Sequence, residues 1–185
     1  MSTITEDPAK RDLIEKIRKG DQGSFEEFFF SHQKSVFNFL YRFTFDYDAA
    51  SDLTQETFIK FWQNRENLDA NKYPVAYLFK IAKNAALNSL RTPVSVVSID
   101  DQENVLAGLY DNPESEYDNK FMLNDFQKAL TLLPERCRAI FILSRYHDMP
   151  YDEIAQVMEI SIQTVKNQMN KSLGILRSAL SKYLE

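Results

Sequence analysis

The stretch PYDEIAQVMEISIQTVKNQMNKSLGILRSALSKYL, residues 150–184, predicts a short helix, a tight turn and a longer helix starting at Ser161. Pro150 suits the first turn of a helix, and Ser161 is a good N-cap ahead of an apolar-periodic run. Two helices joined in this way form a helix-turn-helix unit. On the second helix, apolar residues recur at three- and four-residue steps: Ile162, Val165, Met169, Leu173 and Leu176.

The exposed face of this second helix is rich in hydrogen-bond donors and carries no negative charge. Side chains of this length reach base edges and phosphates, so the face predicts a recognition helix for duplex DNA. Its members are Gln163, Thr164, Lys166, Asn167, Asn170 and Lys171. A surface hairpin with an ordinary polar face is the alternative interpretation. The turn at 158–160 lacks the glycine that favours a left-handed residue, a conformation that costs other residues roughly 1–2 kcal/mol.

The composition indicates a mostly helical protein. Of its 185 residues, 44% are hydrophobic and 13% aromatic, which is enough for packed cores, and only four are glycine. The N-terminus has no apolar leader, and no run approaches the ~18 apolar residues of a membrane span. A cytoplasmic protein without membrane insertion is therefore expected.

Nothing in the sequence predicts catalysis, a metal site or a cofactor. The only histidines, His32 and His147, have no cysteine or second histidine near them in sequence, so structural or surface roles are expected. The single cysteine, Cys137, excludes an internal disulfide and is expected to be a small buried apolar group. A glycine-rich phosphate loop is also missing from the sequence.

The first half of the chain predicts a helical domain over residues 1–92. A charged helix is expected at 10–19, a second helix opening with a capping box at Ser24–Glu27, a third opening at Asp48, and a fourth at about 74–90. Eleven of the fourteen phenylalanines lie before residue 92 and supply a large core. The fourth helix is expected to expose a basic and amide-bearing stripe, made of Lys80, Lys83, Asn84, Asn88 and Arg91.

The net charge of −5 is concentrated in one segment. Residues 1–92 carry thirteen basic and thirteen acidic groups, and residues 121–185 carry eight basic and seven acidic groups. Residues 93–120 carry one basic and seven acidic groups and break the helical period. The sequence thus predicts an all-α protein of two small helical domains, 1–92 and 121–185, joined by an acidic flexible linker, 93–120. Both domains are too close to neutral to grip DNA by bulk electrostatics.

Three motifs, in this order and at this spacing, resemble the extracytoplasmic-function (ECF) sigma factors of bacterial RNA polymerase, in the sigma-70 family. DLTQETF at 52–58 resembles the D-L-x-Q-E-x-F signature of sigma region 2. AYLFKIAKN at 76–84 resembles the later W-L-x-x-I-A-x-N of that region. LPER at 133–136, followed by YDEIA at 151–155 and TVK at 164–166, resembles region 4. The resemblance covers residues from about 20 to 182.

The resemblance implies a protein that binds core RNA polymerase and recognises and melts promoter DNA. Asp52, Gln55 and Glu56 match the face that docks on the polymerase clamp helices, and the second domain is expected at the flap. Lys166, Asn167, Asn170 and Lys171 above all match the reader of the minus-thirty-five element. An anti-sigma factor is a further expected partner. The residues that match the capture of the minus-ten strand are Asn67, Asn71, Lys72, Tyr73, Tyr77, Lys80, Lys83, Asn84, Asn88 and Arg91.

Two interpretations of the minus-ten tyrosines remain open. An aromatic platform beside amide donors suits single-stranded DNA, in which a stacked base contributes ~1–3 kcal/mol. Tyr73 and Tyr77 can equally serve to pack the fourth helix onto the core. The sequence also departs from the family: Tyr77 stands where tryptophan is usual, and Gln168 and Leu173 stand where arginine is frequent, which predicts fewer phosphate contacts.

The acidic linker has a predicted mechanical role. The promoter elements lie ~50 Å apart at ~34 Å per helical turn, and 28 extended residues span ~90 Å at ~3.3 Å each. A free linker averages only ~30 Å, so the domains should lie too close together until polymerase separates them. The family implies that the acids mimic RNA in the exit channel; merely keeping the linker soluble is the alternative. These acids are Asp100, Asp101, Glu103, Asp111, Glu114, Glu116 and Asp118.

A stand-alone helix-turn-helix regulator that acts without binding polymerase is the competing function. Such a protein would bind a duplex site by itself, typically as a symmetric dimer. The near-neutral DNA-reading domain and the aromatic-rich first half both argue against it.

Overall fold

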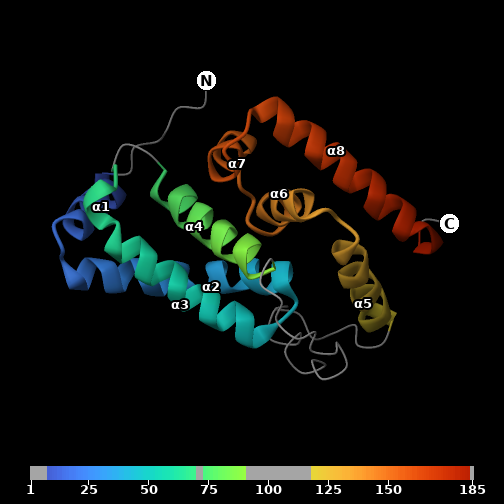
Figure 1. The fold of residues 1–185 in the computed structure, drawn as a ribbon, viewed down its shortest axis with the longest axis horizontal. Coiled ribbons are helices and arrows are strands. Elements are labelled where there is room, and N and C mark those ends of the chain that lie inside the picture. Colours follow the sequence, from blue (N-terminus) through green and yellow to red (C-terminus); the bar gives the residue numbers. More distant parts are fainter. Residues whose placement is uncertain (1–7, 70–72, 91–117, 184–185) are drawn as a thin grey trace.

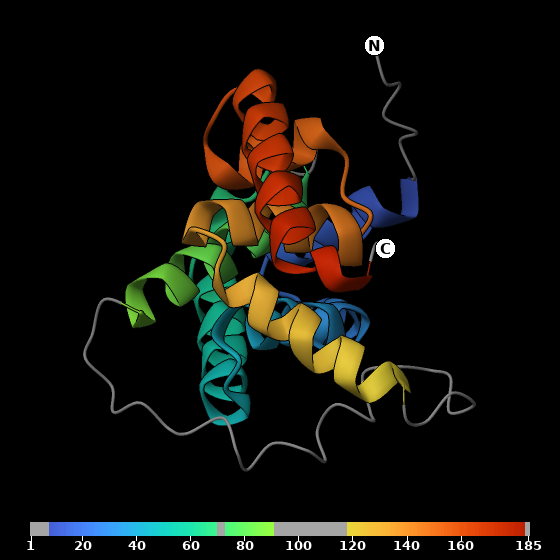
Figure 2. The ribbon, with the colours of Figure 1, turned by 90° about the vertical axis from the view of Figure 1, so that its right-hand side faces the viewer.

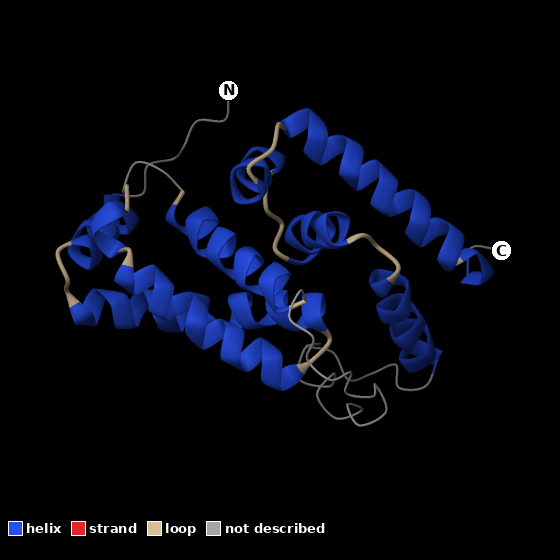
Figure 3. Ribbon diagram, in the orientation of Figure 1, coloured by secondary structure: helices blue, strands red, loops and turns tan. Residues whose placement is uncertain are grey.

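A computed structural model describes residues 8–69, 73–90 and 118–183, and every regular element within them is a helix (Figure 1, Figure 3). The predicted all-α fold is thereby confirmed. The acidic segment lies outside the described residues except for its last three positions, which begin a helix at Asp118. The elements are α1 (Pro8–Arg18), α2 (Gln22–Thr44), α3 (Tyr47–Gln63), η1 (Arg65–Asn67), α4 (Pro74–Ser89), α5 (Asp118–Thr131), α6 (Glu135–Tyr146), α7 (Tyr151–Met158), α8 (Ile162–Ala179) and η4 (Ser181–Tyr183).

The first domain, α1 to α4, is built around aromatic side chains, as the phenylalanine density predicts. Phe28, Phe39, Phe43 and Phe61 are all fully buried, and the rings of Phe28 and Phe61 stack with centroids 4.9 Å apart. Leu90, which the helical period places on the inner face of α4, is instead 45% exposed. It is the C-cap residue of α4, so it follows the last regular turn on which the helical period is defined.

The start of α2 differs from the predicted capping box. The N-cap is Asp21, whose Oδ1 accepts a hydrogen bond from the Ser24 amide at 2.7 Å, while Ser24 lies inside the helix. Gly20, at φ 90°, turns the chain just before it. The helix therefore begins before Ser24. Gly20 allows the chain to turn, and the carboxylate of Asp21, the next residue, caps the helix. Likewise, α3 is capped by Asp46 rather than opened by Asp48.

Removing the Asp21 cap tests this assignment. We expect Asp21→Ala to lower the urea concentration at the unfolding midpoint by roughly 0.5 M, because the Ser24 amide loses its acceptor. Urea denaturation measures the difference. Glu27→Ala is the matched control: it removes the carboxylate that a Ser24 capping box would need, and it should leave the stability nearly unchanged. A larger loss in Glu27→Ala than in Asp21→Ala would contradict the assignment.

The helix-turn-helix of the second domain forms where it is predicted. Ser161 caps α8, since its Oγ accepts from the Thr164 amide at 3.1 Å. The turn without glycine places Glu159 in the left-handed region, at φ 57°. Val165, Met169 and Leu176 of α8 are buried, as their spacing predicts, whereas Ile162 and Leu173 are exposed.

The two domains pack directly against each other. Helix α4 contacts α7, and α2 contacts α6 (Figure 1, Figure 2). Arg138 of α6 donates from Nη1 to the carbonyl oxygen of Phe43 at 3.0 Å, and its guanidinium lies over the Phe43 ring. Arg42 of α2 lies over the Tyr146 ring, 4.2 Å from its centroid. The expectation that the domains lie close together in the free chain is confirmed by these contacts.

Candidate nucleic-acid and protein interfaces

The outer face of α3 presents the three predicted docking residues together. Asp52, Gln55 and Glu56 are all exposed, and Lys60, one turn further along, forms an ion pair with Glu56. Lys60 therefore belongs to the same surface, at the i+4 position that favours such pairs. The face can accept hydrogen bonds from a partner and carries both signs of charge.

An apolar groove borders this face and was missed in the sequence reasoning. It measures about 590 Å³ and includes Ile59, whose side chain is 55% exposed. Ile59 follows Gln55 by four positions, so the helical spacing alone places it on the docking surface. An exposed apolar groove beside polar residues is a common feature of protein-binding surfaces. The remaining lining residues are Gln22, Phe25, Phe29, Gln55, Phe58, Trp62 and Gln63.

The predicted recognition face of α8 is assembled as expected. Gln163, Lys166, Asn167, Asn170 and Lys171 are exposed, and Thr164 is half-buried. The Gln163 Nε2 donates to Asn167 Oδ1 at 3.1 Å, which orients both amides along the helix surface. Helix α8 lies beyond α6 and α7 as seen from α4 (Figure 1). These side chains are therefore accessible to a duplex.

Gln168 is half-buried and points toward α6 rather than outward with this face. Its Oε1 accepts a hydrogen bond from the Cys137 thiol at 2.7 Å, and Ser172 donates to the Cys137 carbonyl oxygen at 3.3 Å. Cys137 is buried, as predicted. The glutamine found where the family often carries arginine thus connects α8 to α6.

The minus-ten residues are only partly brought together. Asn67 is exposed in η1, and Tyr73 is the half-buried N-cap residue of α4. Tyr77 is half-buried with its ring 6.0 Å from that of Phe61. Tyr77 therefore packs against the core of its own domain in this arrangement, and base stacking by this ring stays a prediction. Asn71, Lys72 and Arg91 lie outside the described residues.

The prediction that the basic stripe of α4 is exposed is wrong for Lys83. This side chain is only 5% exposed, because α7 of the second domain covers it. Burial lowers the pKa of Lys83, with nearby Glu159 opposing that shift. Lys80 is half-buried, and its Nζ lies 2.7 Å from Glu159 Oε1. Asn84 and Asn88 remain exposed at the rim.

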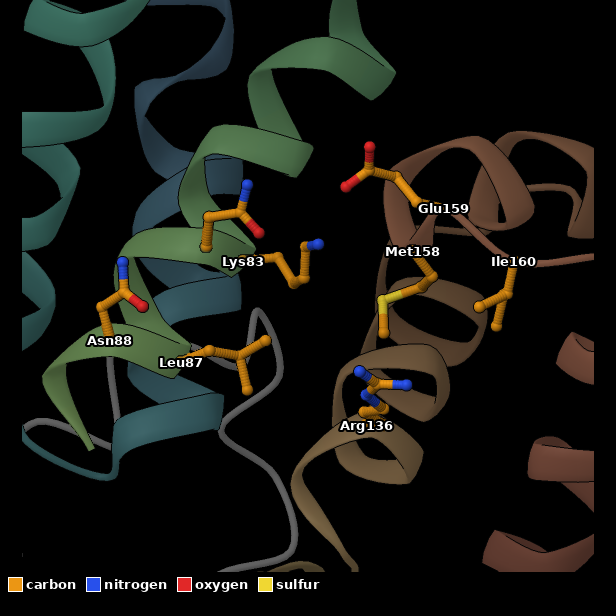
Figure 4. Close-up of a pocket in the computed structure, with 8 residues that line it drawn as sticks. Lys83, Leu87, Asn88, Arg136, Met158, Glu159 and Ile160 are labelled. Carbon is orange, nitrogen blue, oxygen red and sulfur yellow. The ribbon is translucent and has the colours of Figure 1, made fainter. Parts of the chain in front are cut away.

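A cavity of about 430 Å³ lies between α4 and the second domain, beside Lys83 (Figure 4). Lys83, Asn84, Leu87 and Asn88 form its α4 wall. The opposite wall comes from the second domain and consists of Arg136, Met158, Glu159 and Ile160. The stripe predicted to follow a DNA strand thus faces a protein wall.

His147 lies at the same domain interface, which agrees with a structural role. Its ring centroid is 5.0 Å from that of Phe79 and 6.2 Å from that of Phe39. Burial lowers its pKa to about 4, and the positive charge of Arg42 adds to this while Asp148 opposes it. In the described residues, no group of histidine, cysteine and carboxylate side chains is arranged to hold a metal ion.

The half-buried His147 predicts an acid-sensitive interface. Its pKa falls from 6.5 in the unfolded chain to about 4 in the folded one, so the unfolded state binds the proton first. The stabilisation is complete above pH 6.5 and disappears as the pH falls toward 4, by up to ~3 kcal/mol. Denaturation curves across this range should show the loss, and His147→Phe should remove that part of it. An unchanged pH profile in His147→Phe would contradict this account.

Comparison with known proteins identifies the family. The model of Sigma-70 region 2 matches residues 28–93, and that of Sigma-70, region 4 matches residues 123–175. The RNA polymerase sigma-H factor of Pseudomonas aeruginosa is 28% identical over 182 residues, covering 93% of this chain and 94% of the relative. The ECF RNA polymerase sigma factor SigW of Bacillus subtilis is 24% identical over 176 residues, covering 90% and 94%.

Two solved structures share the fold. CnrH, determined in complex with the cytosolic domain of CnrY, superposes with a TM-score of 0.74 at 19% identity, covering 94% of this chain and 98% of the other. The sigma factor RpoE, determined in complex with the anti-sigma factor NepR from Bartonella quintana, gives 0.67 at 21% identity, covering 85% and 96%. Together, the region 2 and region 4 matches span more than half of the sequence. The chain therefore belongs to the sigma-70 family, as an ECF sigma factor.

Proposed function

We propose that this sigma factor binds core RNA polymerase through α3 and directs promoter-specific initiation by recognising and melting promoter DNA. The division of labour follows the two domains: residues 1–92 dock on the clamp helices and capture the minus-ten strand, and residues 121–185 read the minus-thirty-five element beside the flap. The observation that carries the proposal is the pair of exposed faces, acceptor-rich on α3 and donor-rich on α8. The chain binds and positions, and it performs no chemistry of its own.

The docking surface combines charge with apolar area. Asp52, Gln55 and Glu56 supply acceptors, and the adjoining groove with Ile59 and Trp62 supplies apolar surface. A partner helix with basic and apolar residues on one face suits this combination. The apolar part contributes affinity, and the charged part fixes orientation and speeds association.

The α8 face reads duplex DNA in this proposal. Asn167 and Asn170 have the bidentate amides that suit adenine, and Lys166 and Lys171 reach guanine edges or phosphates. With Gln168 turned inward, the helix offers fewer cations, and the domain as a whole is nearly neutral. Duplex affinity is therefore weak until polymerase contributes its own DNA contacts.

The loop before α4 and the helix itself receive the melted strand. Tyr73 caps α4, Tyr77 lies in its first turn, and Asn67 ends the preceding short helix η1. Lys80, Lys83, Asn84 and Asn88 continue along α4. Asn71, Lys72 and Arg91 complete the proposed strand path. An aromatic platform followed by cations and amides suits a single strand of nucleic acid.

An anti-sigma factor is the proposed inhibitory partner. The RpoE structure was determined with such a protein, and a partner that covers the α3 face and its groove would exclude polymerase. The proposed location is the cytoplasm, where polymerase acts. Among residues 8–69, 73–90 and 118–183, no helix is long and apolar enough to span a lipid bilayer.

Run-off transcription with purified core polymerase on a genomic promoter library tests the proposal. Specific transcripts that require this chain support it and also give the promoter sequence. A chain that leaves the transcripts of core polymerase unchanged, yet shifts duplex sites alone, would support the stand-alone regulator instead.

A further inference from the structure

The cations proposed to guide the promoter strand are already engaged by an acid from the second domain. Lys80 Nζ of α4 lies 2.7 Å from Glu159 Oε1, and the two residues come from different domains. Lys83, one turn along α4, extends toward the cavity wall that contains Glu159 (Figure 4). Its side chain is only 5% exposed. A carboxylate therefore occupies the space beside the lysines in which a strand phosphate would bind.

The electrostatics of this contact favour an ionised acid. The Lys80 hydrogen bond and charge lower the pKa of Glu159, and the charge of Lys83 contributes in the same direction. Glu159 in turn opposes the effect of burial on the pKa of Lys83. The group is thus a negative charge held between cations, which is the chemistry that a phosphate would offer.

The backbone places this acid where it can reach α4. Glu159 ends α7 in a left-handed conformation, with its amide donating to the Gln156 carbonyl oxygen at 3.3 Å. The turn of the helix-turn-helix unit therefore carries the carboxylate that pairs with Lys80. By contrast, the recognition face of α8 stays exposed.

The ion pair is a selective contact rather than the main force holding the domains together. The side chains of Lys80 and Glu159 remain 34% and 58% exposed, and exposed pairs of this kind contribute little net stability. Arg138 on Phe43 and the rings around His147 supply buried contacts at the same interface. A weak electrostatic contact on top of packed surface can be displaced by a larger binding partner.

We propose that the packed arrangement is an autoinhibited state in which Glu159 substitutes for a promoter phosphate on Lys80 and Lys83. This inference rests on the proposed function, since it assumes that α4 binds the melted strand. In the free chain the strand path is closed while the minus-thirty-five face stays open. Core polymerase, by separating the domains, removes Glu159 and frees the lysines.

Charge reversal of Glu159 tests the closure in the full-length chain. In Glu159→Lys, repulsion from Lys80 and Lys83 replaces a weak attraction, which should shift the equilibrium from the packed arrangement toward separated domains. The readout is the modification rate of Lys83 by an amine-reactive reagent, followed by peptide mass spectrometry, with exposed Lys166 as the internal reference. We expect Lys83 to react about tenfold faster relative to Lys166, because its protection reflects the closed fraction. Unchanged protection of Lys83 would overturn the inference.

Binding of a fluorescent single-stranded oligonucleotide of mixed sequence tests the inhibition. The matched control is Glu26→Lys, which makes the same change of charge at an exposed position of α2. We expect Glu159→Lys to bind about tenfold more tightly than Glu26→Lys, since the affinity of a closed chain is reduced by its open fraction. Equal affinity of the two variants would also overturn the inference.

The double exchange Lys80→Glu with Glu159→Lys keeps the ion pair but swaps the positions of its positive and negative side chains. It should restore the protection of Lys83 that Glu159→Lys removes, and failure to restore it would contradict a specific pair.

A separate measurement isolates the proposed function: Lys80→Ala should weaken open-complex formation by the assembled holoenzyme. If holoenzyme formed with Lys80→Ala melts promoters normally, the strand path on α4 is wrong, whatever the state of Glu159.

Discussion

Reversing two charges on α3, with Asp52→Lys and Glu56→Lys together, is expected to weaken binding to core RNA polymerase by roughly 30-fold, equivalent to about 2 kcal/mol. Both side chains are exposed, so the fold should tolerate the change. The loss arises because the variant offers cations where the proposed surface offers acceptors to a basic partner. The affinity is measured by fluorescence anisotropy with labelled sigma factor and purified core enzyme.

The control for this variant makes the same change of net charge at a different place in the domain. Asp12→Lys with Glu15→Lys alters the charge of the same domain by the same amount on α1, where Asp12 is exposed and Glu15 is half-buried. Its affinity for core enzyme should stay near that of the unmodified chain. Equal losses in the two double variants would show that net charge, rather than the α3 surface, controls docking.

Removing two side chains from the recognition face of α8, with Lys166→Ala and Asn167→Ala together, is expected to reduce transcription from minus-thirty-five-dependent promoters by roughly 30-fold or more. The loss is expected because each good base contact contributes about 1–3 kcal/mol. Both side chains are exposed on α8, so stability should change little. Run-off transcript yield at limiting holoenzyme measures the effect.

Two comparisons make the recognition-helix result specific. Arg177→Ala removes a cation from the last turn of the same helix, far from the helix-turn-helix turn, and should be nearly silent. On a template whose minus-thirty-five element has been replaced, the double variant and the unmodified chain should give equal, low yields. A double variant that transcribes its natural promoter normally would place minus-thirty-five recognition elsewhere.

The fold was predictable because its signals are local. Periodic apolar residues define α8, Ser161 caps it, and the many phenylalanines of the first half form the core of α2 to α4. Errors arose where several local signals compete. Ser24 and Asp21 can each cap a helix, and the chain uses Asp21 because Gly20 reverses the backbone just before it.

The burial of Lys83 could not be predicted from local pattern. Its position on the polar side of α4 correctly indicates that it faces away from the core of its own domain. What covers it is the α7 end, more than seventy residues further along the chain. Contacts between separately folded domains depend on how well their surfaces fit together, and helical periodicity gives no information about that fit. The Lys80–Glu159 pair was missed for the same reason.

Two features of the functional surfaces were within reach of the sequence. Ile59 lies one turn beyond Gln55 on α3, so an exposed apolar neighbour of the docking residues follows from the spacing alone. The inward position of Gln168 follows from its place beside Met169 and one turn before Ser172, both buried on α8. The conformations of the minus-ten loop and of the acidic linker lie outside the described residues.

The central claim is that the two helical modules recognise a promoter only when core polymerase holds them. The most direct measurement is an electrophoretic mobility shift of one promoter fragment, titrated with this chain in the presence and absence of core enzyme at physiological salt. We predict a sequence-specific complex with the chain and core together, and no specific complex with the chain alone. Tight, specific occupancy of the duplex by the chain alone, unaffected by core enzyme, would contradict the account.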